Sequence, residues 1–104
     1  MIEDAWIKAI DSEWDPEGEA FLYQVRQGNF DPAGLERTLK KLRAISIEPS
    51  ATVLSRRLVE VLWFMPQFME WQRDRVRKNG TDPHTYDVAV TLVTNEIERI
   101  LGLP

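Results

Sequence analysis

The sequence of 104 residues predicts an all-α fold, a compact bundle of four to five helices in a single domain spanning residues 1–104. Three observations lead to this prediction. Apolar residues recur at three- and four-residue spacings along most of the chain. Prolines, glycines and Asp-Pro pairs divide the chain into segments of helical length. Hydrophobic residues make up 43% of the chain, which is enough for one core.

The first two helical segments lie on either side of an acidic turn. Ile2, Trp6 and Ile10 are spaced four residues apart and form one face of a short helix. In the turn DSEWDPEG, Asp15 followed by proline is a typical helix start. The aspartate side chain accepts free N–H groups, and proline fits the first helical position. We therefore expect a second helix that begins there and stops at Gly28.

The next two helices carry clear apolar stripes. Asp31 again precedes a proline, and three leucines at helical spacing follow: Leu35, Leu39 and Leu42. The longest helix, the third after the short N-terminal one, is expected to begin with Ser50 as its cap and to run to about Lys78. Seven apolar residues lie on one face of it: Leu54, Leu58, Val61, Leu62, Met65, Met69 and Val76. Pro66 predicts a kink in this helix, because proline removes a backbone hydrogen bond.

The final segment allows two interpretations. Thr81 or Asp82 can cap a last helix after the turn NGTDP. Six apolar residues fit that helix: Tyr86, Ala89, Val93, Ile97, Ile100 and Leu101. Three others alternate as in a strand: Val88, Val90 and Leu92. An α+β fold with a short strand near 86–94 is thus the alternative. We prefer the helix, because only the short stretch 45–47 could pair with a strand.

Composition excludes several kinds of site. The chain has no cysteine, so it has no disulfide, thiolate metal site, iron–sulfur cluster or cysteine nucleophile. The longest uncharged apolar stretch, VLWFMPQFM, is too short to span a bilayer. The first residues carry acids where a signal peptide needs bases. We therefore expect a cytoplasmic protein with no membrane partner.

The net charge of −4 is unevenly distributed. Residues 1–20 hold seven acids and one base, whereas residues 21–80 hold six acids and eleven bases. Many of these bases lie near the expected helix C-termini, where they offset the helix dipole. The basic residues therefore have a structural explanation, and together with the acidic net charge this argues against a nucleic-acid partner.

We expect no enzymatic activity, no catalytic residues, no bound metal and no cofactor. His84 is the only histidine, and its neighbours Asp82 and Asp87 make a carboxylate-metal hydrolase the one enzymatic alternative. A metal site needs more ligands than these, so exposed residues at a helix start are the preferred interpretation. Acids at every second position from Asp11 to Glu19 suggest a calcium loop. However, its sixth position is proline instead of glycine, and its twelfth is leucine instead of glutamate.

The acidic segment near the N-terminus is the first predicted binding surface. Its members are Asp11, Glu13, Trp14, Asp15, Glu17 and Glu19. Acids interleaved with a tryptophan suit docking to a basic protein, and they would speed its association. The leading hypothesis is therefore a non-enzymatic protein-binding module. In its sharpest form it is a small cytoplasmic inhibitor of the immunity or antitoxin type. A solvated acidic turn without a partner is the alternative interpretation.

The long helix carries the second predicted binding surface. Four residues form it: Trp63, Phe64, Gln67 and Trp71. At 100° per residue, they lie away from the leucine and methionine face. Large aromatic side chains around a polar one are typical of binding hot spots. This face predicts a helical homodimer or a regulatory subunit as the second hypothesis. Alternatively, the helix is central and buries these residues against a neighbour.

Overall fold

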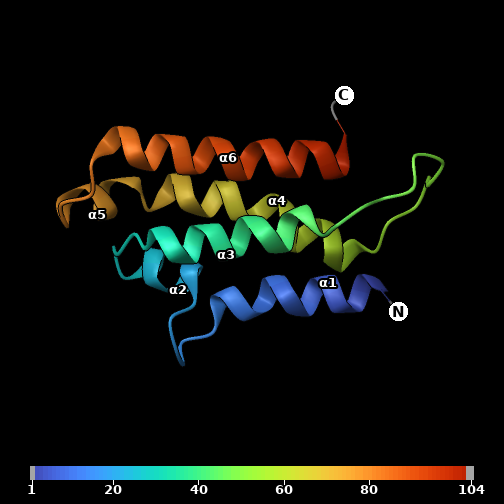
Figure 1. The fold of residues 1–104 in the computed structure, drawn as a ribbon, viewed down its shortest axis with the longest axis horizontal. Coiled ribbons are helices and arrows are strands. Elements are labelled where there is room, and N and C mark those ends of the chain that lie inside the picture. Colours follow the sequence, from blue (N-terminus) through green and yellow to red (C-terminus); the bar gives the residue numbers. More distant parts are fainter. Residues whose placement is uncertain (1, 103–104) are drawn as a thin grey trace.

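The computed structural model describes residues 2–102 (Figure 1). Within this range the chain forms six α-helices, one short 3-10 helix and no strand. The all-α prediction is therefore confirmed. The alternative of a strand near 86–94 is wrong, because this stretch lies inside the last helix, α6 (Pro83–Leu101).

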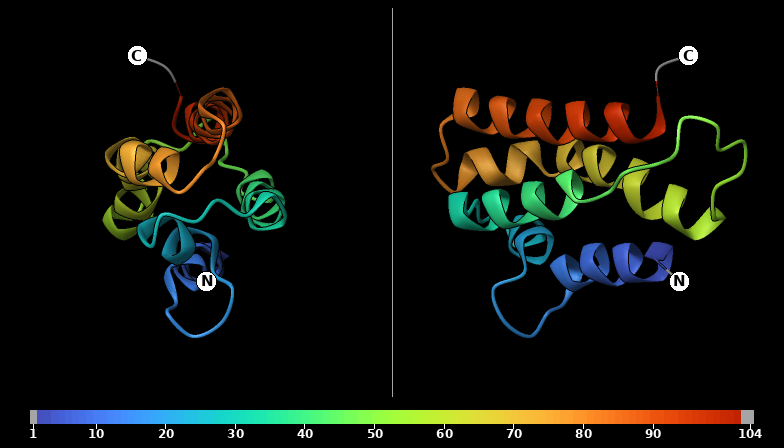
Figure 2. Two further views of the ribbon diagram at one scale, coloured as in Figure 1. Left: turned by 90° about the vertical axis from the view of Figure 1, so that its left-hand side faces the viewer. Right: turned by 45° about the vertical axis from the view of Figure 1, so that its right-hand side comes forward.

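Four longer helices surround the core: α1 (Ile2–Asp11), α3 (Pro32–Arg43), α4 (Arg56–Trp71) and α6. Seen along the bundle, α6 and α1 lie opposite each other, with α3 and α4 on either side between them (Figure 2, left). Accordingly, α3 and α4 each pack against both α1 and α6. The short helices α2 (Phe21–Arg26) and α5 (Arg73–Lys78) lie at one end of the bundle. The 3-10 helix η1 (Ser12–Trp14) follows α1.

Side-chain caps set the first residues of the longer helices. Asp31 caps α3 and Asp82 caps α6, each accepting a backbone N–H of the first turn, as predicted. Ser55 caps α4, and its hydroxyl accepts a first-turn N–H at 3.4 Å. The Ser55 N–H donates in turn to Glu3 of α1 at 3.1 Å, so a contact between helices fixes this start. The expected start at Ser50 is therefore wrong.

The predicted long helix is divided into two. It continues through Pro66 and is interrupted at Gln72, after which α5 begins. The Gln72 N–H is shared between the Phe68 carbonyl at 3.1 Å and the Met69 carbonyl at 3.3 Å, an arrangement common at helix ends. The Met69 carbonyl also accepts the buried Tyr86 hydroxyl of α6 at 2.7 Å. The break at Gln72 therefore gives residues 2–102 one helix more than the four to five expected.

The core contains most of the residues predicted for it, although on the face predicted for the first helix only Ile10 is buried and Ile2 is 67% exposed. On the face predicted for the long helix, every apolar residue is buried except Leu54, which precedes α4 and is half-buried. The three leucines of α3 are buried as well. Burial of these side chains supplies the main driving force for folding. The helical period of the sequence thus located the core correctly.

One buried hydroxyl has no partner. Thr38 of α3 is fully buried, and its Oγ1 makes no hydrogen bond within residues 2–102. An unpaired buried hydroxyl destabilises the folded state, so we expect Thr38→Val to raise the free energy of unfolding by about 1 kcal/mol. Urea unfolding measures the change. Thr38→Ser, which keeps the hydroxyl and leaves a small cavity, should lower stability instead. A Thr38→Val protein less stable than the original would contradict this interpretation.

Candidate functional site

Glu13 lies inside the protein and not on the predicted acidic surface. Only 1% of the surface of Glu13 is exposed to solvent. Its Oε1 accepts the Phe21 N–H at 2.9 Å, and its Oε2 accepts the Arg37 Nε at 2.9 Å. Lys41 donates to the same carboxylate. Glu13 therefore fastens η1 to both α2 and α3, and it is not available to a partner.

The pKa of the Glu13 carboxyl shows whether burial or hydrogen bonding has the larger effect on its charge. Burial by itself raises this pKa, but hydrogen bonds from Arg37, Lys41 and the Phe21 N–H outweigh burial. The pKa therefore lies below its ordinary value. The same hydrogen bond raises the pKa of Arg37. The carboxylate is charged at neutral pH, and its charge is balanced within the fold.

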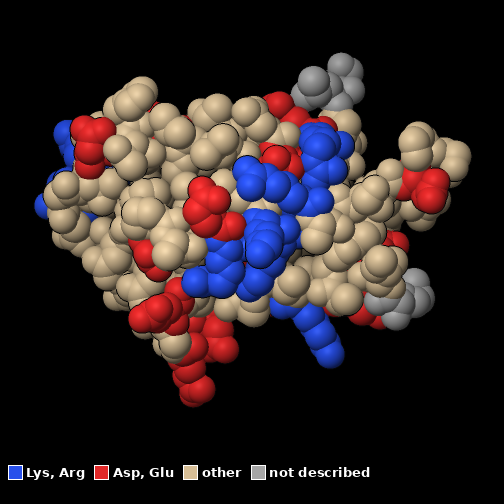
Figure 3. Space-filling view, viewed as in Figure 1, with Lys and Arg blue, Asp and Glu red and all other residues tan. Residues whose placement is uncertain are grey.

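The other acids of this segment differ in their availability. Asp11 pairs with Arg57 of α4 at 3.2 Å. Asp15, Glu17 and Glu19 are exposed on the loop 15–19, where acids project at the lower edge of Figure 3. Within residues 2–102, no lysine or arginine forms an ion pair with these three. The Asp15 carboxylate accepts the Glu17 N–H at 2.9 Å in a turn. The expected helix start at Asp15 is therefore wrong, and α2 begins later.

The two tryptophans of α4 are exposed to solvent. Trp63 is 49% exposed and Trp71 is 65% exposed. Gln67 is exposed between them, and Phe64 is half-buried. The alternative in which α4 buries both tryptophans against a neighbouring helix is therefore wrong.

Phe64 connects the two surfaces that the sequence predicted separately. Its ring lies 5.8 Å from Trp14, 6.1 Å from Trp63 and 5.6 Å from Trp71, between centroids. Trp14 also contacts Phe68 edge-on at 4.7 Å. Together these five residues form one continuous patch, which we call the aromatic surface. The tryptophan of the acidic segment thus belongs to the same patch as the tryptophans of α4.

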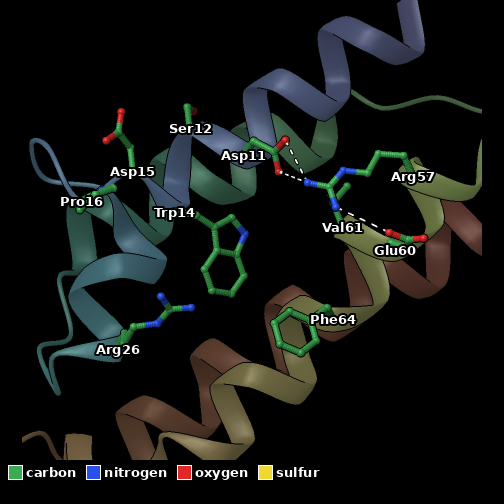
Figure 4. Close-up of a pocket in the computed structure, with 10 residues that line it drawn as sticks. All are labelled: Asp11, Ser12, Trp14, Asp15, Pro16, Arg26, Arg57, Glu60, Val61 and Phe64. Atoms are coloured by element: carbon green, nitrogen blue, oxygen red, sulfur yellow. Dashed lines mark hydrogen bonds and ion pairs between the residues drawn. The ribbon is translucent and has the colours of Figure 1, made fainter.

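A groove with a volume of about 680 Å³ opens beside Trp14 (Figure 4). Ten residues line it: Asp11, Ser12, Trp14, Asp15, Pro16, Arg26, Arg57, Glu60, Val61 and Phe64. The Trp14 and Phe64 rings point toward the middle of the groove, and Arg26 reaches in from α2. The groove therefore combines an apolar wall with charged side chains from three helices.

The two arginines of the groove differ in their partners. Arg57 donates to Asp11 at 3.2 and 3.3 Å and lies 3.6 Å from Glu60. The Arg26 guanidinium lies over the Trp14 ring at 5.5 Å and over a second aromatic ring at 5.4 Å. No carboxylate among residues 2–102 pairs with Arg26. Arg57 is therefore neutralised by its neighbours, and Arg26 is not.

The residues around His84 do not converge on one point. Asp82 caps α6 through the Thr85 N–H, and Asp87 pairs with Arg73. His84 itself is exposed. No group of three or more His, Cys, Asp or Glu side chains that could hold a metal occurs within residues 2–102. Asp82 therefore stabilises the start of α6, and Asp87 stabilises its contact with α5.

Two further surface features concern possible partners. Basic residues gather over α3 in Figure 3, but most of them are paired within the protein. Arg37 and Lys41 bind Glu13, and Arg43 lies 3.5 Å from Glu96. Within the described part of the chain, no helix is long and apolar enough to cross a membrane.

Sequence reasoning did not single out Arg26 or Arg57. Both lie in ordinary helical segments, and no local pattern places Arg26 beside Trp14. Trp14 ends η1, whereas Arg26 is the last residue of α2, which begins after the loop 15–20. Only the fold reveals that one arginine is paired and the other is not. Comparison of the chain with protein-family models, with curated proteins and with solved structures found no match.

Proposed function

We propose that this chain is a non-enzymatic protein-binding module whose aromatic surface contacts the partner. One observation carries the proposal: Trp63 and Trp71 stay largely exposed although each offers a large apolar area. Large apolar residues that form a contiguous exposed patch mark interaction sites in soluble proteins. Tryptophan is also enriched among the residues that dominate binding energy. Covering these two rings would remove apolar area from water and so stabilise a complex.

In its sharpest form, the module is a small inhibitor that blocks a basic partner. The support for this form is the loop 15–19, whose carboxylates at Asp15, Glu17 and Glu19 are exposed and form no ion pair within residues 2–102. This loop directly follows Trp14 and so borders the aromatic surface. Charges placed beside a contact area accelerate the encounter of oppositely charged proteins. The acids would therefore guide the partner, and the rings would hold it.

Capture from a cell extract, followed by calorimetric titration of the purified partner, tests the aromatic surface. We expect the double variant Trp63→Ser, Trp71→Ser to bind the purified partner about 1,000-fold more weakly, because hot-spot residues contribute about 2 kcal/mol or more each. Val53→Ser is a suitable control, since Val53 is 82% exposed but lies in the loop before α4. Equal affinities of the double variant and the original chain would refute the proposal.

The same titration tests whether the acidic loop itself, and not merely the net charge of the chain, speeds association with the partner. The amide variant Asp15→Asn, Glu17→Gln, Glu19→Gln should slow association at low salt, with the difference fading at high salt. A control with equal net charge changes three exposed acids elsewhere: Glu36, Glu48 and Glu98. If the association rate falls equally in both variants, the acidic loop has no special role in guiding the partner. Sedimentation at several concentrations identifies the other possible occupant, because a second copy of this chain would appear as a dimer.

A further inference from the structure

The charges that line the groove are mostly cancelled by one another. Arg57 holds Asp11 at 3.2 Å, and Glu60 lies 3.6 Å from Arg57 and 3.2 Å from Arg56. Asp11, Arg57 and Glu60 thus form one chain of ion pairs in the groove, as the dashed lines of Figure 4 show. Arg56 extends this chain, but its side chain is 95% exposed and does not line the groove. Arg57 is therefore held between two carboxylates and offers no unpaired positive charge to a ligand.

Asp15, the third acid of the groove, does not point into it. The Asp15 carboxylate accepts the N–H of Glu17 at 2.9 Å and so turns back onto its own loop. In Figure 4 it points away from the space between Trp14 and Phe64. Asp15 therefore belongs to the outer rim of the groove and not to its interior.

Arg26 is the remaining charge, and it points inward. Its guanidinium lies over the rings of Trp14 at 5.5 Å and Phe68 at 5.4 Å. Attraction to the faces of two rings holds a guanidinium in place without using its N–H groups. These N–H donors have no acceptor within residues 2–102. The groove thus presents one fixed, unpaired positive charge beside an aromatic wall.

From this arrangement we infer that the groove binds a small aromatic carboxylate. The ring of the ligand packs against Trp14 and Phe64, and its carboxylate accepts hydrogen bonds from the Arg26 fork. Guanidinium and carboxylate match in geometry, because two parallel N–H donors meet two oxygens. The groove volume of about 680 Å³ is typical of sites for small organic ligands. The inference goes beyond the proposed protein contact, since it concerns a different ligand.

Three probes of similar shape and different charge test the assignment: phenylacetate, phenylacetamide and phenethylamine. Calorimetric titration should show saturable binding of phenylacetate with a Kd of about 1 mM or tighter. Phenylacetamide should bind about tenfold more weakly, because it loses the charge-assisted hydrogen bonds. Phenethylamine should bind more weakly still. A phenethylamine affinity equal to or above that of phenylacetate would overturn the proposal, as would the absence of saturable phenylacetate binding.

A matched pair of variants tests the role of Arg26. Arg26→Gln should weaken phenylacetate binding about tenfold. Lys40→Gln removes the same charge from an exposed residue of α3 that does not line the groove, and it should leave the affinity unchanged. The indole N–H resonance of Trp14 should shift with phenylacetate in the original chain and in the Lys40 variant. Equal affinities of the Arg26 and Lys40 variants would overturn the assignment.

The two proposed sites share Trp14 and Phe64, but Trp63 and Trp71 distinguish them. Neither Trp63 nor Trp71 lines the groove, so the double serine variant should retain the phenylacetate affinity of the original chain. Loss of partner binding in that variant with retained phenylacetate binding supports both proposals. A chain that binds its protein partner but not phenylacetate retains the proposed function and loses the groove ligand.

Discussion

Replacement of Glu13 by glutamine is expected to lower the free energy of unfolding at neutral pH by about 2 kcal/mol, because it removes the charge that Arg37 and Lys41 share. The two cations are only partly buried, with side chains 39% and 27% exposed, so water can solvate them again. The expected loss of stability is therefore smaller than it would be for a wholly buried ion-pair network. Urea unfolding of the two proteins measures the difference. Glu17→Gln, a change on the exposed loop, should leave stability nearly unchanged.

The pH dependence of that difference tests its electrostatic origin. The pKa of Glu13 is lowered from 4.5 in the folded chain, so the unfolded chain binds more protons as the pH falls past this value. The stabilisation by Glu13 is therefore complete above pH 4.5, and it is lost as the pH falls through the folded pKa. Glutamine does not titrate, so the stabilities of the two proteins should converge in acid. A difference that stays constant between about pH 7 and pH 3 would contradict this origin.

Replacement of Gly28 by alanine is expected to lower the free energy of unfolding by about 3 kcal/mol. Gly28 has φ +87°, a conformation that residues with a Cβ rarely adopt. A Cβ there would also lie 2.4 Å from Asn79 Nδ2 and 2.8 Å from Arg75 Cγ. These two side chains donate to the carbonyls at the end of α2, including Arg26 O at 2.7 Å. The substitution would therefore separate α2 from α5.

Gly18→Ala separates the two causes of that loss. Gly18 has φ +104°, but no atom lies within 4 Å of the position that its Cβ would take. Its substitution should therefore lower the free energy of unfolding by only about 1 kcal/mol, through backbone strain. Thermal or urea unfolding of both variants provides the comparison. Equal losses in the two variants would show that the close approach of Asn79 and Arg75 does not matter.

Sequence reasoning predicted two helix starts from a local Asp-Pro signal, although the same signal at Asp15 predicted a start that the structure does not have. Asp31 and Asp82 each stand directly before a proline and cap the helix that follows, so the starts of α3 and α6 were correct. The start of α4 depends on Glu3, which lies in a helix distant in the sequence. The break at Gln72 involves Tyr86 in the same way. A helix boundary that is set by a residue of another helix cannot be predicted from the local sequence.

The candidate site shows the same difference between local signals and contacts from distant parts of the chain. Trp63 and Trp71 lie on one face of one helix, so their spacing was enough to predict a shared aromatic face. Glu13 was predicted to be on the surface, because an acid among other acids resembles a solvated turn. The cations that draw Glu13 inward come from 24 and 28 residues away. Arg37 and Lys41, four residues apart on α3, were the only signal that could have indicated a buried acid.

The Phe64 side chain belongs both to the groove and to the aromatic surface. If both proposed ligands bind, each of them touches this ring from its own side. A small molecule that changes the ring position then changes the affinity for the protein partner. Thermodynamic reciprocity requires the partner to change the affinity for the small molecule by the same factor. Phe64, together with Trp14, would thus make the association of two proteins responsive to the concentration of a small aromatic carboxylate.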